Sequence, residues 1–219
     1  MGIAVLSTFF PRELSAYFTS RLLVGRVVCL WLALSASILV LSHEKSLAFA
    51  AFGILMIAVL IVQFRLWDDL VDRDIDAVLH PHRVIVVTDF VRYFARFCYL
   101  LTLPVAALLG FVFGMLHLFI YGFLLVAISV LYAIPRIKLP KLLRAHLVLL
   151  KYPIFIWLCT AEANPVQWAC LSTAVYLAIC LFELFSDASL RNVAAWRVLA
   201  IIEVAVFVVL QILFIRNFS

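Results

Sequence analysis

The sequence predicts an all-α membrane protein, a polytopic bundle of about seven transmembrane helices. Hydrophobic residues make up 68% of the 219 residues and charged residues only 13%, which leaves too little polar surface for a water-soluble protein of this length. The hydrophobic residues also fall into blocks about as long as the apolar core of a bilayer is thick. Because an open strand in lipid would leave its backbone amides unpaired, each block is expected to be a helix.

Seven such blocks are expected to span the membrane. Their approximate ranges are 22–42, 46–67, 91–113, 116–134, 146–162, 166–186 and 196–215. Pro104 and Pro153 lie inside two of them and should kink those helices. No linker or low-complexity segment divides the chain, so residues 1–219 are expected to form a single domain.

The basic residues indicate how the bundle is oriented. All but two of the 17 Lys and Arg residues lie at the amino-terminal side or beside the connections after the second, fourth and sixth spans; the exceptions are Lys45 and Arg216. The positive-inside rule places the amino terminus and those connections in the cytoplasm, and the carboxyl terminus on the opposite side. The same placement explains the net charge of +5 without a nucleic-acid partner.

The most informative segment lies at the cytoplasmic end of the second predicted span. It contains five aspartates, Asp68, Asp69, Asp72, Asp74 and Asp76. Wound as a helix, four of them and Arg65 fall within an arc of about 100°, whereas Asp74 points to the opposite side. Carboxylates on one stripe repel each other, so a cation must offset them. Two interpretations are open: nearby arginine side chains, or Mg²⁺, which binds carboxylate oxygens together with substrate phosphates.

A second acidic pair closes the sixth predicted span. Glu183 and Asp187 are four residues apart, on one helical face and at the same expected depth as the aspartates. Acidic residues there are costly unless they are paired or face a polar cavity. Asp187 could pair with Arg191, or the two carboxylates could form a second metal-binding pair opposite the first.

Several basic and polar side chains are candidates for binding a diphosphate. Arg83 follows the aspartates in a polar turn, where a guanidinium fork suits phosphate oxygens, although it also serves as a cytoplasmic positive charge. Lys151 begins an otherwise apolar helix and either snorkels or points inward to phosphate. The predicted substrate-binding residues are Arg65, Arg83, Tyr132, Arg136, Lys138 and Lys151.

This pattern resembles the UbiA superfamily of intramembrane prenyltransferases. The family's first motif, NDxxDxxxD at the end of its second helix, is matched by residues 68–76, with Arg83 in the following turn. Residues 132–138 are similar to the family's Tyr- and Lys-containing loop, and residues 183–187 stand where its second motif belongs. The chain departs from the family in having Asp68 in place of Asn, ExxxD in place of DxxxD, Val84 in place of Pro, and seven spans in place of nine.

The resemblance implies a Mg²⁺-dependent enzyme that ionises a prenyl diphosphate and transfers the prenyl group to an acceptor. It implies catalytic roles for Asp68, Asp69, Asp72 and Asp76, and Mg²⁺ ligation by Asp68, Asp72, Asp76, Glu183 and Asp187. Two alternatives remain: a UbiA-type terpene cyclase, and a non-catalytic membrane scaffold with a degenerate site. Transport is disfavoured because no charged residue is expected clearly at mid-membrane. The acceptor, the prenyl length and the oligomeric state are left open.

Overall fold

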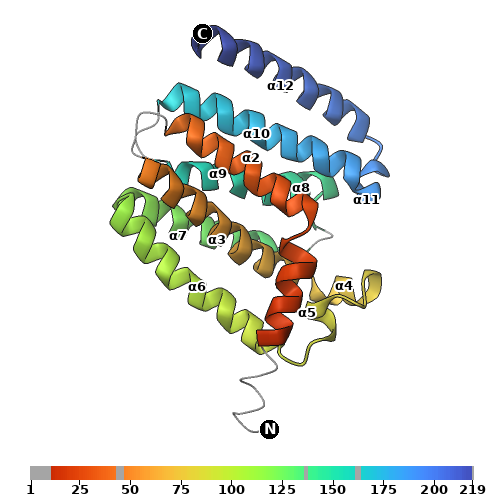
Figure 1. The fold of residues 1–219 in the computed structure, drawn as a ribbon. Coiled ribbons are helices and arrows are strands. Elements are labelled where there is room, and N and C mark those ends of the chain that lie inside the picture. Colours follow the sequence, from red (N-terminus) through yellow and green to blue (C-terminus); the bar gives the residue numbers. More distant parts are fainter. Residues whose placement is uncertain (1–10, 43–46, 136–137, 161–163, 219) are drawn as a thin grey trace. The chain divides into compact units, whose positions relative to one another are not determined.

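A computed structural model describes residues 11–42, 47–135, 138–160 and 164–218, and within these ranges all regular secondary structure is helical (Figure 1). The predicted all-α class is therefore confirmed for this part of the chain. Contacts between residues divide the chain into two compact units, residues 1–32 with 58–108 and residues 33–57 with 109–219. The boundaries fall inside α2 (Gly25–Leu41), α3 (Leu47–Val71) and α6 (Val91–Val112). The expectation of a single domain stays a prediction.

The first unit opens with the helical segment Pro11–Leu22, which meets α2 at a bend of 73°. Its last turn, η1 (Phe18–Leu22), is a π-helix, and the Leu23 N–H donates to the Phe18 carbonyl at 2.9 Å. The Ser20 hydroxyl donates to the Ala16 carbonyl at 2.6 Å, a local bond that commonly accompanies a distorted helix. Single π-turns of this kind are frequent at functional sites.

A hydrophobic core holds this segment against the polar end of α3. Its buried members are Tyr17, Leu22, Leu66, Ile85, Phe94 and Cys98. Two short helices, α4 (Arg73–Leu79) and α5 (Val84–Val87), follow α3. The Arg73 guanidinium links them, because its Nε donates to the Ile85 carbonyl at 3.0 Å. The end of α3, where the aspartates lie, is thus surrounded by packed elements.

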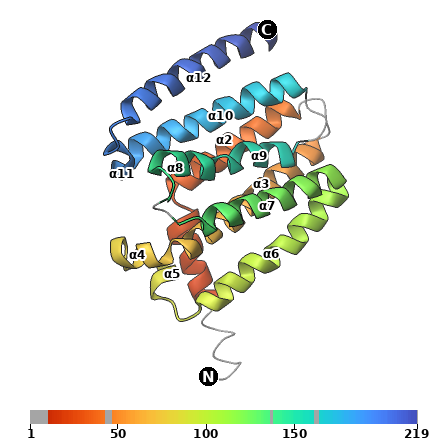
Figure 2. The ribbon, with the colours of Figure 1, turned by 180° about the vertical axis from the view of Figure 1, so that it is seen from behind.

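The second unit is organised around α10 (Pro165–Ser186). The Asn164 side chain caps this helix by accepting from the Val166 N–H at 2.9 Å, and Pro165 occupies the first turn, where its missing N–H costs nothing. Four helices contact α10: α8 (Lys141–Leu149), α9 (Lys151–Leu158), α11 (Ala188–Arg191) and α12 (Trp196–Phe218). Figures 1 and 2 show α10 and α12 side by side from opposite directions. Another helix of this unit, α7 (Met115–Ala133), contacts α9.

Within the described residues, four helices are long and apolar enough to cross a membrane: α3, α6, α7 and α10. A fifth span results if Pro11–Leu22 and α2 together form one bent crossing. The chain is therefore a helical membrane protein, and four to five of the seven predicted spans are confirmed among the described residues. The range 146–162 is divided between α8 and α9, which break at Leu150 and are each too short. The last predicted span corresponds to α12, whose side chains are described only as far as Ile212.

One close backbone approach in the second unit depends on a glycine. A Cβ added at Gly53 would lie 2.7 Å from the backbone oxygen of Cys159 and 3.2 Å from the Ile38 side chain. Real Cβ atoms essentially never approach another atom as closely as 2.7 Å, so only glycine fits beside the Cys159 oxygen without a shift of the backbone. By contrast, a Cβ at Gly122 on α7 would meet no atom within 4 Å.

Candidate functional site

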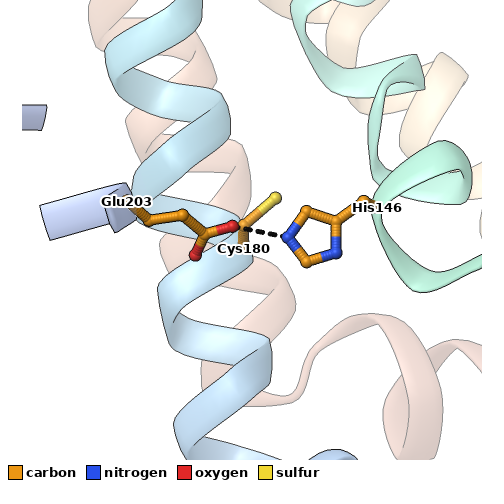
Figure 3. Close-up of side chains that lie close together, drawn as sticks. All are labelled: His146, Cys180 and Glu203. Carbon is orange, nitrogen blue, oxygen red and sulfur yellow. Dashed lines mark hydrogen bonds and ion pairs between the residues drawn. The ribbon is translucent and has the colours of Figure 1, made fainter. Parts of the chain in front are cut away.

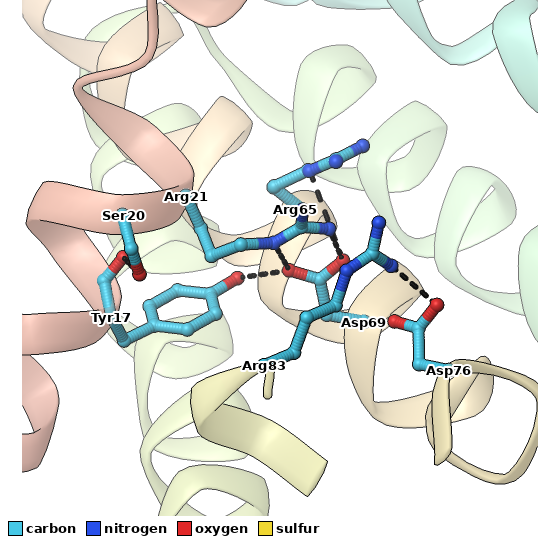
Figure 4. Close-up of polar contacts among 7 residues, drawn as sticks. All are labelled: Tyr17, Ser20, Arg21, Arg65, Asp69, Asp76 and Arg83. Atoms are coloured by element: carbon cyan, nitrogen blue, oxygen red, sulfur yellow. Dashed lines mark hydrogen bonds and ion pairs between the residues drawn. The ribbon is translucent and has the colours of Figure 1, made fainter. Parts of the chain in front are cut away.

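Asp69, in the last turn of α3, is a buried carboxylate with three hydrogen bonds (Figure 4). Arg21 donates through Nε to Oδ2 at 3.0 Å and through Nη2 to Oδ1 at 2.5 Å. The Tyr17 hydroxyl also donates to Oδ2, at 2.9 Å. A buried charge is tolerable only when it is paired and hydrogen-bonded, and the two-point Arg21 contact meets that requirement.

Both partners of Asp69 come from the segment Pro11–Leu22. Tyr17 and Arg21 are four residues apart, so the helical turn places them on the same face. The Tyr17 ring is 1% exposed and packs 5.7 Å from the Phe94 ring, which fixes the direction of its hydroxyl. The hydrophobic core of the first unit therefore positions the polar contacts.

Arg65 lies one turn before Asp69 and makes a longer contact with it. Its Nε is 3.9 Å from Asp69 Oδ1, and the Arg65 side chain is 36% exposed. Partial exposure screens this ion pair, which makes it weaker than the Arg21 pair.

A second ion pair joins Asp76 of α4 to Arg83, which immediately precedes α5. Asp76 is 6% exposed. Together with Arg21 and Asp69 these residues line a single small pocket, whose apolar wall is formed by Val84 and Ile85. The pocket has no room for a water molecule in this arrangement, because the ion pairs fill it. We call Arg21, Asp69, Asp76 and Arg83 the aspartate–arginine cluster.

The other three aspartates of the segment, Asp68 and Asp72 on the predicted stripe and Asp74 opposite it, do not line this pocket. Asp68 and Asp72 are half-buried, and Asp74 is exposed. The continuous helix expected across the motif breaks at Asp72, because α3 ends at Val71 and α4 begins at Arg73. Asp72 has φ −87° and ψ 1°, which lies outside the α-helical region. The structure therefore brings together two of the four aspartates on the predicted stripe, Asp69 and Asp76.

The remaining predicted site residues belong to the second unit. Glu183 and Asp187 are half-buried at the end of α10, and their expected position opposite the aspartates stays a prediction. Lys138 is exposed and Tyr132 is half-buried. Lys151 is 2% exposed, with its Nζ 5.5 Å from the Tyr152 ring centroid, a cation–π contact. Arg136 lies outside the described residues.

The cluster suits Mg²⁺ in the kind of donor it offers, because carboxylate oxygens are the ligands that this ion prefers. Asp69 and Asp76, however, are already held by guanidinium groups. For these two aspartates the charge that offsets repulsion is arginine, which was one of the two interpretations of the sequence. Arg65 adds a third guanidinium group beside Asp69, at a longer distance.

Several residues with clear contacts were missed by the sequence analysis. Arg21 was treated only as a topological charge, and Tyr17 was not considered. Glu203 was not considered either; it lies inside the apolar helix α12 and is 4% exposed. The expectation that no charged residue lies clearly at mid-membrane stays a prediction. Glu203 could have been identified from the sequence, because it is a lone carboxylate within an apolar run. No local sequence feature identifies Tyr17.

Comparison of the chain with family models, with curated proteins and with solved structures gives no match. The resemblance to the UbiA superfamily thus continues to rest on the motif residues. The fold and the site define the chain as a helical membrane protein with a buried aspartate–arginine cluster at one end of a membrane-spanning helix.

Proposed function

We propose that the chain is a membrane-embedded prenyltransferase that binds a prenyl diphosphate at the aspartate–arginine cluster. The observation that carries the proposal is the meeting of two buried carboxylates and two arginines at one pocket, at the polar end of an apolar helix. An amphiphile with a charged head and an isoprenoid tail matches that combination. Its tail would lie among apolar helices, and its head would reach the arginines.

Binding would proceed by exchange of ion-pair partners. Diphosphate oxygens would take over the forks of Arg21 and Arg83, which suit phosphate as well as carboxylate. Asp69 and Asp76 would then be free to accept a cation together with the half-buried Asp68 and Asp72. Mg²⁺ held there would neutralise the leaving diphosphate. The pocket has no room for a water molecule while these pairs are formed, so the proposed binding requires that they part.

The chemical step would break the bond between the allylic carbon and the diphosphate oxygen. The electron pair leaves with the diphosphate, and the acceptor then supplies the pair that forms the new bond to carbon. The acceptor's proton passes to solvent or to a nearby base. Arg83 stabilises the charge that develops on the leaving group, as a fixed cation does in other transition states.

The proposal includes the finer topology. The amino terminus and the cluster would lie in the cytoplasm, with seven crossings placing the carboxyl terminus on the opposite side. The metal-binding role of Glu183 and Asp187 and the diphosphate-binding role of Lys138, Lys151 and Tyr132 stay predictions from the sequence, and Arg136 lies outside the described residues.

A non-catalytic scaffold is the second candidate, and one observation favours it. Asp69 and Asp76 are already paired, and the pocket between them is closed. A purely structural cluster, which only ties the segment Pro11–Leu22 and α5 to α3 and α4, would need these same contacts.

The deciding experiment measures diphosphate release from a panel of prenyl diphosphates by the purified protein in lipid nanodiscs, with and without Mg²⁺. We expect Mg²⁺-dependent release that is abolished by Asp76→Asn and retained by Asp74→Asn, a matched change at an exposed aspartate on the same short helix. Release only with an added acceptor extract supports transfer, whereas a cyclic hydrocarbon without acceptor indicates a cyclase. If a folded wild-type protein releases no diphosphate from any chain length, the enzyme proposal fails and the scaffold remains.

A further inference from the structure

Three helices of the second unit each contribute one metal-binding side chain to a single point (Figure 3). His146 comes from α8, Cys180 from α10 and Glu203 from α12. Their ligand atoms all lie within 4.8 Å of one another, and His146 Nε2 is 2.5 Å from Glu203 Oε1. Residues separated by up to 57 positions in the chain therefore converge on one site.

The site is shielded from solvent. Glu203 is 4% exposed and Cys180 is 1% exposed, while the His146 side chain is 17% exposed. The second oxygen of Glu203, Oε2, is buried and has no hydrogen-bond partner among the described residues. A buried carboxylate oxygen without a partner costs free energy, and an ion bound by both oxygens of Glu203 would remove that cost.

The hydrogen bond behind His146 sets which ring nitrogen faces the cluster. Nδ1 lies 2.7 Å from the Leu142 carbonyl, an acceptor, so Nδ1 carries the proton in the neutral ring. The lone pair of Nε2 then points at Glu203, and two acceptors facing each other repel. Either a second proton on the ring or a cation between the two atoms removes that repulsion. A ligating histidine held through its other nitrogen by a carbonyl is the usual arrangement in metal sites.

We propose that His146, Cys180 and Glu203 bind a divalent transition-metal ion, with Zn²⁺ as the best match. Nitrogen, sulfur and carboxylate oxygen are the ligands of zinc, whereas thiolate sulfur excludes Mg²⁺ and Ca²⁺. Two ligands of a tetrahedral ion at roughly 2 Å lie about 3.3 Å apart, so Nε2 and Oε1 need to separate by less than about 1 Å. The fourth position would be open to water or an exogenous ligand.

Charge balance favours an ion at this depth. On binding, the Cys180 thiol releases its proton to solvent and becomes a thiolate. The thiolate and the Glu203 carboxylate together then neutralise the two positive charges of the ion. A neutral complex is much cheaper to bury in an apolar helix bundle than a net charge is. The site lies in the second unit and does not depend on the proposed prenyl transfer.

The backbone around the site is already held in place. The Tyr176 hydroxyl, one turn before Cys180 on α10, donates to the His146 backbone oxygen at 3.2 Å. This bond ties α8 to α10 without the ion. Metal binding would add α12 to the pair through Glu203, so the ion should stabilise the packing of three helices.

The test is stoichiometric metal binding by the full-length purified protein after removal of metals with a chelator. Zn²⁺ is measured by competition with a chromophoric chelator, and Co²⁺ serves as a spectroscopic probe. We expect one ion per chain, and a near-ultraviolet thiolate-to-Co²⁺ charge-transfer band. Zn²⁺ should also raise the melting temperature.

The matched variants are Cys180→Ser and Cys170→Ser, two changes on the same helix, of which only the first removes a proposed ligand. Cys180→Ser and His146→Gln should weaken Zn²⁺ binding by more than the roughly 10–100-fold that loss of an outer partner costs. Cys170→Ser should keep the wild-type affinity and the Co²⁺ band. Circular dichroism checks that each variant folds.

Three results would overturn the proposal. One is the absence of stoichiometric Zn²⁺ binding by folded wild-type protein, which would leave His146 and Glu203 as an ion pair only. Another is a Co²⁺ band that persists in Cys180→Ser. The last is equal loss of binding in the Cys170→Ser control, which would show that the ion binds elsewhere on α10.

Discussion

Replacing Arg21 by methionine tests whether the aspartate–arginine cluster depends on a buried charge pair. The change keeps an unbranched apolar stem and removes both hydrogen bonds to Asp69, whose side chain is only 6% exposed. Removing one partner of a buried pair typically costs about 3–5 kcal/mol, because the other charge is left uncompensated. Asp69 would keep the Tyr17 hydrogen bond and the distant Arg65, so we expect about 3 kcal/mol, the lower end of that range.

Two further variants show whether the loss of stability comes from the buried Arg21–Asp69 pair. Arg65→Met removes a longer contact from a side chain that is 36% exposed, and should cost less than about 1 kcal/mol. The double change Arg21→Met with Asp69→Asn removes both charges, and should cost less than Arg21→Met alone. A favourable coupling in this double-mutant cycle is the signature of a direct pair.

The assay is unfolding of the purified protein in mixed micelles titrated with a denaturing detergent, followed by far-ultraviolet circular dichroism and tryptophan fluorescence. Both probes must report one transition for the free energies to be comparable. The reasoning is refuted if Arg21→Met costs no more than Arg65→Met, or if the effects of Arg21→Met and Asp69→Asn simply add.

The same unfolding assay tests the expected effects of changes at Gly53 and Thr88, and a cysteine-labelling experiment tests the burial of Cys159. Gly53→Ala should destabilise the protein by about 1–3 kcal/mol because its Cβ would meet the Cys159 carbonyl. Gly122→Ala, with open space around it, should be neutral or mildly stabilising, and equal losses would contradict the argument. Thr88→Ala should cost about 1 kcal/mol, since the hydroxyl accepts from the Phe90 N–H at 3.0 Å and contacts Glu13. Thr88→Ser keeps the hydroxyl and should retain most of that stability. An equal loss in Thr88→Ser would show that the methyl group, and not the hydroxyl, stabilises the protein. Cys159, at 0% exposure, should resist alkylation in the folded protein and react on unfolding; rapid reaction in the folded state would show that its surroundings open.

The helical class could be predicted because composition alone excludes a soluble fold and lipid excludes open strands. The position of the cluster could also be predicted from the sequence, because Asp69, Asp76 and Arg83 are charged residues at the end of an apolar block. The hydrogen-bond partners of Asp69 could not be predicted, because Tyr17 and Arg21 lie 52 and 48 residues away in the sequence. Helical periodicity places residues on faces of one helix, and it carries no information about which distant segment covers a face.

One of the two helix breaks was equally hard to predict. The predicted aspartate stripe assumes an unbroken helix, but the turn at Asp72 moves Asp76 relative to Asp69. No proline or glycine lies near Asp72, so the local rules that predict helix ends had nothing to detect there. The break at Leu150, which divides the apolar range 146–162, is different: Pro153 follows it in the first turn of α9, and a proline just past a helix end is a usual signal of such a break.

The buried carboxylate on α12 has a consequence for how the last helix finds its place. Apolar side chains attract each other little more strongly than they attract lipid, so they specify the rotation of a helix in a membrane only weakly. A slip of one residue along α12 would shift Glu203 by about 1.5 Å and turn it by about 100°, away from His146. With α12 as one of the proposed crossings, that slip would leave an unpaired carboxylate facing hydrocarbon or apolar side chains, at a cost of roughly 3 kcal/mol. One polar side chain therefore gives α12 a register that its valines, leucines and isoleucines cannot supply.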